Sequence, residues 1–130
     1  MGINYHEISL EDVSRRILTV LNRVPSLKIA LLFGSASRRM IARDVDVGVV
    51  MEPELDLKSL IALANKLEDM LGIPVDLVPL RKASPKLKLK ALLEGFKVIV
   101  RDPGLYASLL SEALSEVMDL DLKLRGARSR

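Results

Sequence analysis

Two aspartates, one residue apart, stand at the start of a run of β-branched residues that is typical of a buried strand. In "RDVDVGVVM" the acids are Asp44 and Asp46, and Val45 and Val47 alternate with them. Residues two apart on a strand point to the same side, so both carboxylates face one way. Burying a bare carboxylate is costly, so these side chains must be paired, solvated or bound to a metal ion.

A third acid lies in a strand-like run later in the chain. Asp76 stands between Val75 and Leu77 in "IPVDLVPL", a run that is otherwise suited to the core. If this strand neighbours the first, its carboxylate can reach the same point as Asp44 and Asp46. Three carboxylates without His or Cys describe a site for Mg²⁺ or Mn²⁺, ions that keep waters and use substrate phosphates as their other ligands. We therefore expect a nucleoside triphosphate, bound with its metal, as the substrate.

The segment before the acids can supply contacts to phosphate. Gly34 and Ser35 follow the apolar run "LKIALLF". Glycine lets the backbone approach a phosphate closely, and backbone amides with a serine hydroxyl donate to anionic oxygens. Arg38 and Arg39 lie about one turn further on and can add charge-assisted contacts. Alone, the Gly-Ser pair would be an ordinary turn with a serine cap, but together with the acids it predicts a nucleotide site.

Helical and strand patterns alternate along the rest of the chain. Caps followed by apolar residues at helical spacing predict helices, and short apolar or β-branched runs between them predict strands. Pro85 and Pro103 each follow a polar cap, which is typical of the first position of a helix, and Gly72 is a natural stop. The predicted helices lie at 9–23, 57–71 and 103–124, with one more beginning at 84, the strands lie at 27–33, 44–51, 73–80 and 96–100, and a short helix or turn lies at 35–41.

These elements predict one α/β (α+β) domain over residues 1–130, a mixed sheet of about four strands with helices packed on it. Its core is expected at 27–101, between the N-terminal helix at 9–23 and the C-terminal helix at 103–124. The basic tail 125–130 is expected to be disordered. A chain of 130 residues has little room for a second substrate-binding domain, so the acceptor has to bring its own binding surface.

Composition excludes several classes of function. The sequence has no Cys, which removes disulfides, thiolate catalysis and zinc–thiolate sites. Without a long apolar run or a signal-peptide pattern, we expect a cytoplasmic protein with no membrane contact. The net charge is only +3 and much of the basic excess lies in the tail, so direct binding of nucleic acid is not expected. The lack of Gln beside abundant charged residues resembles thermophile proteins.

Two further segments are assigned weaker roles. His6 lies in an N-terminal segment for which we predict no fixed structure, and we give it no catalytic role. Leu120, Leu122 and Leu124 extend the apolar pattern of the closing helix beyond what covering a sheet requires, which leaves open a partner surface or a homodimer.

The motifs resemble a known superfamily. "LFGSASRRMIARDVDVGVV" is similar to the signature of the DNA polymerase β-like nucleotidyltransferases, in which a Gly-Ser pair follows one strand, Asp-x-Asp opens the next, and a later strand carries a third acid that matches Asp76. The small size and the run "VDLVPLRKASPKLKLKALLEGFKVIVRDP" resemble the minimal nucleotidyltransferase (MNT) subgroup, often encoded beside a HEPN-domain protein as a toxin–antitoxin pair. The resemblance covers roughly 27–124, and three motif blocks in order are more specific than one.

The resemblance implies transfer of a nucleoside monophosphate, usually AMP from ATP, to an acceptor hydroxyl with release of pyrophosphate. In MNT antitoxins the acceptor is a tyrosine of the HEPN toxin, an RNase that the modification silences, so a HEPN toxin is the implied partner. By the same resemblance, Gly34 and Ser35 hold the β- and γ-phosphates. Asp44 and Asp46 bind two Mg²⁺ (or Mn²⁺) ions, and Asp76 joins the catalytic ion and helps to deprotonate the hydroxyl.

The sequence departs from the MNT pattern after the Gly-Ser pair. Met40 follows Arg39 where the usual loop has a glycine, and the spacer "ASRRMIAR" is shortened. The departure bears on nucleotide affinity and on the roles of Arg38 and Arg39. It favours an alternative, in which a weakly active or inactive binding module neutralises a HEPN-type partner by forming a complex. A third interpretation is a stand-alone transferase for a small molecule or an RNA end, with an acceptor site formed at a dimer interface.

Overall fold

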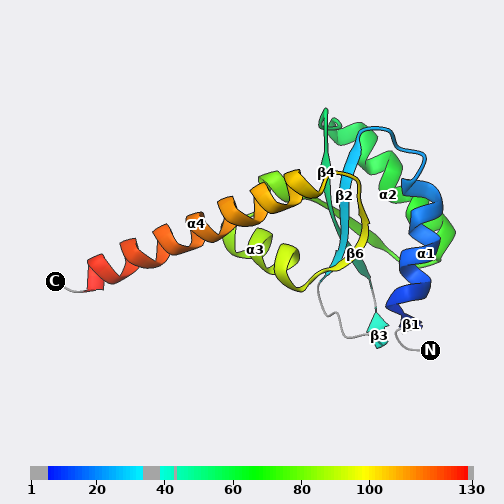
Figure 1. Ribbon diagram of the computed structural model, residues 1–130. Coiled ribbons are helices and arrows are strands. Elements are labelled where there is room, and N and C mark those ends of the chain that lie inside the picture. Colours follow the sequence, from blue (N-terminus) through cyan, green and yellow to red (C-terminus); the bar gives the residue numbers. More distant parts are fainter. Residues whose placement is uncertain (1–5, 34–38, 43, 129–130) are drawn as a thin grey trace.

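A mixed β-sheet with helices on both faces forms the body of the protein (Figure 1). The computed structural model describes residues 6–33, 39–42 and 44–128. Within these residues the main sheet has four strands in the order β5-β4-β2-β6, with β2 antiparallel to β4 and β6, and β4 parallel to β5. The strands are β2 (Leu27–Phe33), β4 (Val45–Met51), β5 (Val75–Pro79) and β6 (Phe96–Val100). The predicted fold class is confirmed.

Helices cover the sheet in two pairs, and this explains the continuous apolar runs of its central strands. Successive residues of β2 alternate between two cores, with Ala30 and Leu32 in the first and Leu31 and Phe33 in the second. The first core lies under α1 (Leu10–Leu21) and α2 (Leu57–Leu71), and the second lies under α3 (Pro85–Glu94) and α4 (Pro103–Arg128). A short 3₁₀ helix, η1 (Leu80–Lys82), follows β5.

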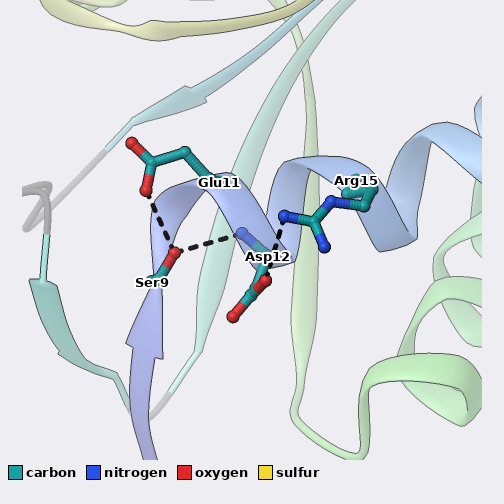
Figure 2. Close-up of polar contacts among 4 residues, drawn as sticks. All are labelled: Ser9, Glu11, Asp12 and Arg15. Atoms are coloured by element: carbon teal, nitrogen blue, oxygen red, sulfur yellow. Dashed lines mark hydrogen bonds and ion pairs between the residues drawn. The ribbon is translucent and has the colours of Figure 1, made fainter.

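Side-chain caps begin the helices where the sequence predicts them. Each cap accepts a hydrogen bond from the backbone N–H three residues on, at 2.8–3.3 Å. Figure 2 shows the first cap, in which the Ser9 hydroxyl accepts from the N–H of Asp12 and donates to Glu11. Gly72 ends α2 with φ 74°, a left-handed conformation that favours glycine. The capping residues are Ser9, Asp56, Ser84 and Asp102.

The prediction of a short helix or turn at 35–41 is wrong at 39–41, and its first part, 35–38, lies outside the described residues. β3 (Arg39–Ala42) is a strand, and it pairs antiparallel with β1 (His6–Ser9), a segment for which no structure was predicted. The register runs from His6 opposite Ala42 to Ser9 opposite Arg39. Each strand has four residues, which is too short for an alternating pattern to stand out, and the pairing joins segments far apart in the chain.

The closing helix is longer than predicted. α4 runs to Arg128, so most of the tail 125–130 that was expected to be disordered is helical. An ion pair between Asp121 and Arg125, one turn apart at 3.1 Å, supports the added turns. The C-terminal half of α4 extends away from the sheet (Figure 1), and Met118, Leu122 and Leu124 are 62%, 63% and 53% exposed there.

Polar contacts fix the first half of α4 to its neighbours. Lys88 of α3 is 8% exposed, and its Nζ lies 3.3 Å from Oε1 of Glu116 on α4. The hydroxyl of Tyr106 donates to the carbonyl oxygen of Leu92, and Nζ of Lys97 lies 4.7 Å from the centre of the Tyr106 ring. These contacts lie between Tyr106 and Glu116, before the exposed residues Met118, Leu122 and Leu124.

Replacing Gly95 with alanine should destabilise the fold. A Cβ there would lie 2.3 Å from the carbonyl oxygen of Ala91 and 3.2 Å from Cβ of Leu31. We expect Gly95→Ala to lower the free energy of unfolding by about 1–3 kcal/mol, because the backbone must shift to relieve the overlap. The control is Gly104→Ala, where the nearest atom is 3.5 Å away. Equal urea midpoints for the two variants would contradict the packing described here.

Candidate active site

The three predicted acids meet at one end of the sheet. Asp46 on β4 is paired in register with Asp76 on β5, and on its other side with Phe33, the last residue of β2. Asp44 immediately precedes β4. The condition set by the sequence, that the strand of Asp76 neighbours that of Asp46, is met. Paired residues of adjacent strands lie about 4.8 Å apart with side chains on the same face, so these two carboxylates are neighbours.

The acids lie on the sheet face that α3 and α4 cover further along. Val45 and Val47 point into the core under α1 and α2, so the alternation of β4 turns Asp46 to the other face. Asp46 is half-buried there, while Asp44 and Asp76 are exposed. A ligand can reach this end of the sheet from solvent.

The carboxylates interact through their charges. Burial raises the pKa of the Asp46 carboxyl, and the negative charges of Asp44 and Asp76 raise this pKa further. In the described part of the chain, no group of three or more His, Cys, Asp or Glu residues is arranged to hold a metal ion by protein side chains alone. Mg²⁺ is usually bound through one or two carboxylates together with substrate phosphates. The donor set therefore fits an ion that arrives with a nucleotide.

The remaining predicted site residues lie mostly outside the described part of the chain. Gly34, Ser35 and Arg38 fall outside it, and only the backbone of Arg39, at the start of β3, is described. The chain enters the segment 34–38 directly after Phe33, the residue paired with Asp46. The described chain therefore ends beside Asp46, at the residue before Gly34.

One feature near the acids was missed by sequence reasoning. The ladder of β1 and β3 ends at Ala42, two residues before Asp44. The sequence signal that might have revealed it, a four-residue alternation at His6–Ser9, is too short to separate from chance.

Residues 15–104 match the family described as Polymerase beta, Nucleotidyltransferase, and this range contains every predicted site residue. The chain belongs to this family. A comparison with curated proteins gave no match. Among the described helices, none has the length and apolarity needed to cross a membrane.

Solved structures share the fold over nearly the whole chain. One is the MntA–HepT toxin–antitoxin, at 24% identity and TM-score 0.72, covering 92% of this chain and 96% of that one. Another is the tri-AMPylated Shewanella oneidensis HEPN toxin in complex with MNT antitoxin, at 24% identity and TM-score 0.74, covering 92% and 95%. A third is a toxin–antitoxin with AMP-PNP, at 25% identity and TM-score 0.70, covering 92% and 96%. The resemblance to MNT proteins noted in the sequence is confirmed.

Removing the charge of Asp46 should not unfold the protein. Because the pKa of Asp46 is raised in the fold, its ionised form at neutral pH lowers stability. We expect Asp46→Asn to leave the free energy of unfolding unchanged or to increase it by up to about 1 kcal/mol, a small value because the group is partly solvated. Asp119→Asn, at an exposed position on α4, is the control. A clear loss of stability in Asp46→Asn, measured by urea denaturation without metal or nucleotide, would indicate a structural ion pair instead.

Proposed function

We propose that this nucleotidyltransferase is metal-dependent and transfers AMP from ATP to a tyrosine hydroxyl of a HEPN-type toxin, and that it thereby acts as an antitoxin. The observation that carries the proposal is the in-register pairing of Asp46 with Asp76, with Asp44 just before β4, in a member of this family. The single domain, with its core at 27–101, is proposed to rely on the partner for the acceptor group.

Asp44, Asp46 and Asp76 are the proposed ligands of two Mg²⁺ or Mn²⁺ ions. When bound, the ions neutralise charge on the triphosphate and on the attacking and leaving oxygens. Gly34 and Ser35 are proposed to donate to the β- and γ-phosphates, and Arg38 and Arg39 to balance their charge. This part rests on the sequence motif and on the position of Phe33 beside Asp46.

Asp76 is the proposed acceptor of the hydroxyl proton. It is exposed, so a tyrosine presented by another protein can approach it. The acceptor oxygen bonds to the α-phosphorus while the bond from this phosphorus to the α–β bridging oxygen breaks, and pyrophosphate leaves with that oxygen. The proton of the hydroxyl passes to the carboxylate of Asp76.

A protein partner is supported by two observations. α4 exposes Leu114, Met118 and Leu122, which share one face of the helix because they are four residues apart, and an exposed apolar stripe of this kind is typical of an interface. The similar solved structures are toxin–antitoxin complexes, one of them with an AMPylated HEPN toxin and another with AMP-PNP. A HEPN-type toxin is therefore the partner, and ATP the nucleotide, that we assign.

The second candidate function is neutralisation by binding without catalysis. It is favoured by the shortened spacer after Ser35 and by Met40 in place of the usual glycine. Under this alternative the exposed face of α4 still binds the partner, but the acids need not be intact. The two functions thus differ in their dependence on Asp76.

The transfer reaction is tested by the mass of the partner. After incubation with ATP, Mg²⁺ and a HEPN-type toxin from the same organism, that toxin should gain the mass of AMP on a tyrosine. Asp76→Asn should reduce this transfer by at least about 10²-fold, because the general base is lost. Asp69→Asn, at an exposed position on α2, should not change it. A partner that is inhibited without added mass, equally by wild type and by Asp76→Asn, would favour the binding module.

The partner surface is tested by a charge on α4. We expect Leu122→Glu to weaken capture of the HEPN-type partner by at least about tenfold, since a carboxylate would be buried in an apolar interface. Leu57→Glu on α2 is the control, because Leu57 is 71% exposed and Leu122 63%. Calorimetry gives the affinity of each variant for the partner. An equal loss of affinity in the two variants would mean that the interface is not at Leu122.

A further inference from the structure

Asp44 lies between the main sheet and the strand β3. β4 begins at Val45, whose N–H donates to the carbonyl oxygen of Pro74 at 2.9 Å, so the ladder with β5 holds the chain from Val45 onward. On the other side of Asp44, the nearest paired residue is Ala42 of β3. Because a peptide is planar, this hydrogen bond also holds the Cα of Asp44. The direction of its side chain still depends on the backbone before it, and β3 lies one residue away on that side.

β3 is held in turn by the N-terminal strand. It pairs with β1 over four residues, from His6 opposite Ala42 to Ser9 opposite Arg39. Ser9 is both the last residue of β1 and the N-cap of α1 (Figure 2). α1 is fixed to the first core by a row of buried residues, Leu10, Val13, Ile17 and Leu21.

The least stable part of this connection between the core and Asp44 is the pairing of β1 with β3. The main sheet and α1 are stabilised by buried side chains on both faces. A ladder of two short strands is only marginally stable by itself in water. β1 and β3 can therefore separate at a lower free energy than global unfolding requires, and such local opening would release Asp44 without disrupting β4 and β5.

We propose that β1 is a positioning element of the nucleotide site, whose pairing with β3 sets the position of Asp44 and with it the affinity for ATP and its divalent cation. The inference rests on the proposed function. If only a fraction of the molecules has the ladder formed, the apparent affinity for ATP is the intrinsic affinity multiplied by this fraction. By reciprocity, bound ATP raises the equilibrium constant for forming the ladder by the factor by which the formed ladder raises the affinity for ATP.

Two proline substitutions in β1 test this in the full-length protein. One of two successive N–H groups on a strand faces the partner strand, so Glu7→Pro with Ile8→Pro removes the inward donor whichever it is. We expect the dissociation constant for ATP with Mg²⁺ to rise at least about tenfold, with the urea transition of the core retained. In an Asp44→Asn background the proline pair should add little, because the residue that β1 positions is already disabled.

A disulfide supplies the converse test, since the sequence has no Cys. Glu7 is opposite Ile41, and Ile8 is opposite Met40. The Cα spacings of antiparallel pairs lie within the range that a disulfide spans. Glu7→Cys with Ile41→Cys, or Ile8→Cys with Met40→Cys, should form a bond on oxidation and then bind ATP with Mg²⁺ as tightly as the reduced protein or more tightly.

The outcomes separate this inference from the proposed function. Absence of Mg²⁺-dependent ATP binding in the wild type would overturn both. Wild-type binding that is lost in Asp46→Asn but unchanged by the proline pair would overturn the role of β1 alone. Failure of both cysteine pairs to oxidise, or weaker binding on oxidation, would overturn it as well. If the variant with both prolines does not fold, the ATP affinity of the cysteine variants, compared before and after oxidation, still tests the role of β1.

Discussion

The parallel pairing of β4 with β5 places Asp46 beside Asp76, and the rest of the fold has to tolerate the repulsion between them. Two unit charges roughly 5 Å apart near a protein surface repel by about 1–3 kcal/mol. Each buried valine side chain contributes about 1.5–3 kcal/mol, and Val45, Val47 and Val75 are all buried on the opposite face of the same strand segments. The core therefore outweighs the repulsion, which leaves two like charges side by side for a cation to neutralise.

Side-chain hydrogen bonds hold the end of the sheet that lies opposite the acids. The guanidinium of Arg101 donates to the carbonyl oxygens of Asn22, Val24 and Leu27 at 2.7–3.0 Å, which ties the end of α1 and the start of β2 to the end of β6. The bond to Asn22 satisfies the carbonyl group of the residue that caps the C-terminal end of α1. β1 and β3, by contrast, have only each other as strand partners among the described residues. The main sheet is thus held by many contacts, whereas β3, the strand that precedes Asp44, is held in a sheet only by its pairing with β1.

Local signals in the sequence predicted most of the fold. Asp56 with Gly72 marked both ends of α2, and the unbroken apolar run of β2 indicated a strand covered on both faces. Asp46 and Asp76 were placed on the correct strands, because a carboxylate in a β-branched run has few structural explanations, whereas Asp44 precedes β4 instead of opening it. The register that pairs Asp46 with Asp76 could not be predicted, since it depends on strand order. The ladder of β1 and β3 was missed because each strand has only four residues and the two lie far apart in the chain. The roles of Gly34, Ser35, Arg38 and Arg39 remain predictions.

The central claim is that the paired acids bind a divalent cation together with a nucleotide. The most direct measurement is a crystal structure of the protein with Mn²⁺ and a non-hydrolysable ATP analogue, in which anomalous scattering locates the metal. We expect Mn²⁺ at bonding distance from the carboxylate oxygens of Asp46 and from a phosphate oxygen, with Asp44 and Asp76 completing the site. An analogue bound elsewhere, or acids that contact basic side chains with no metal between them, would contradict the account.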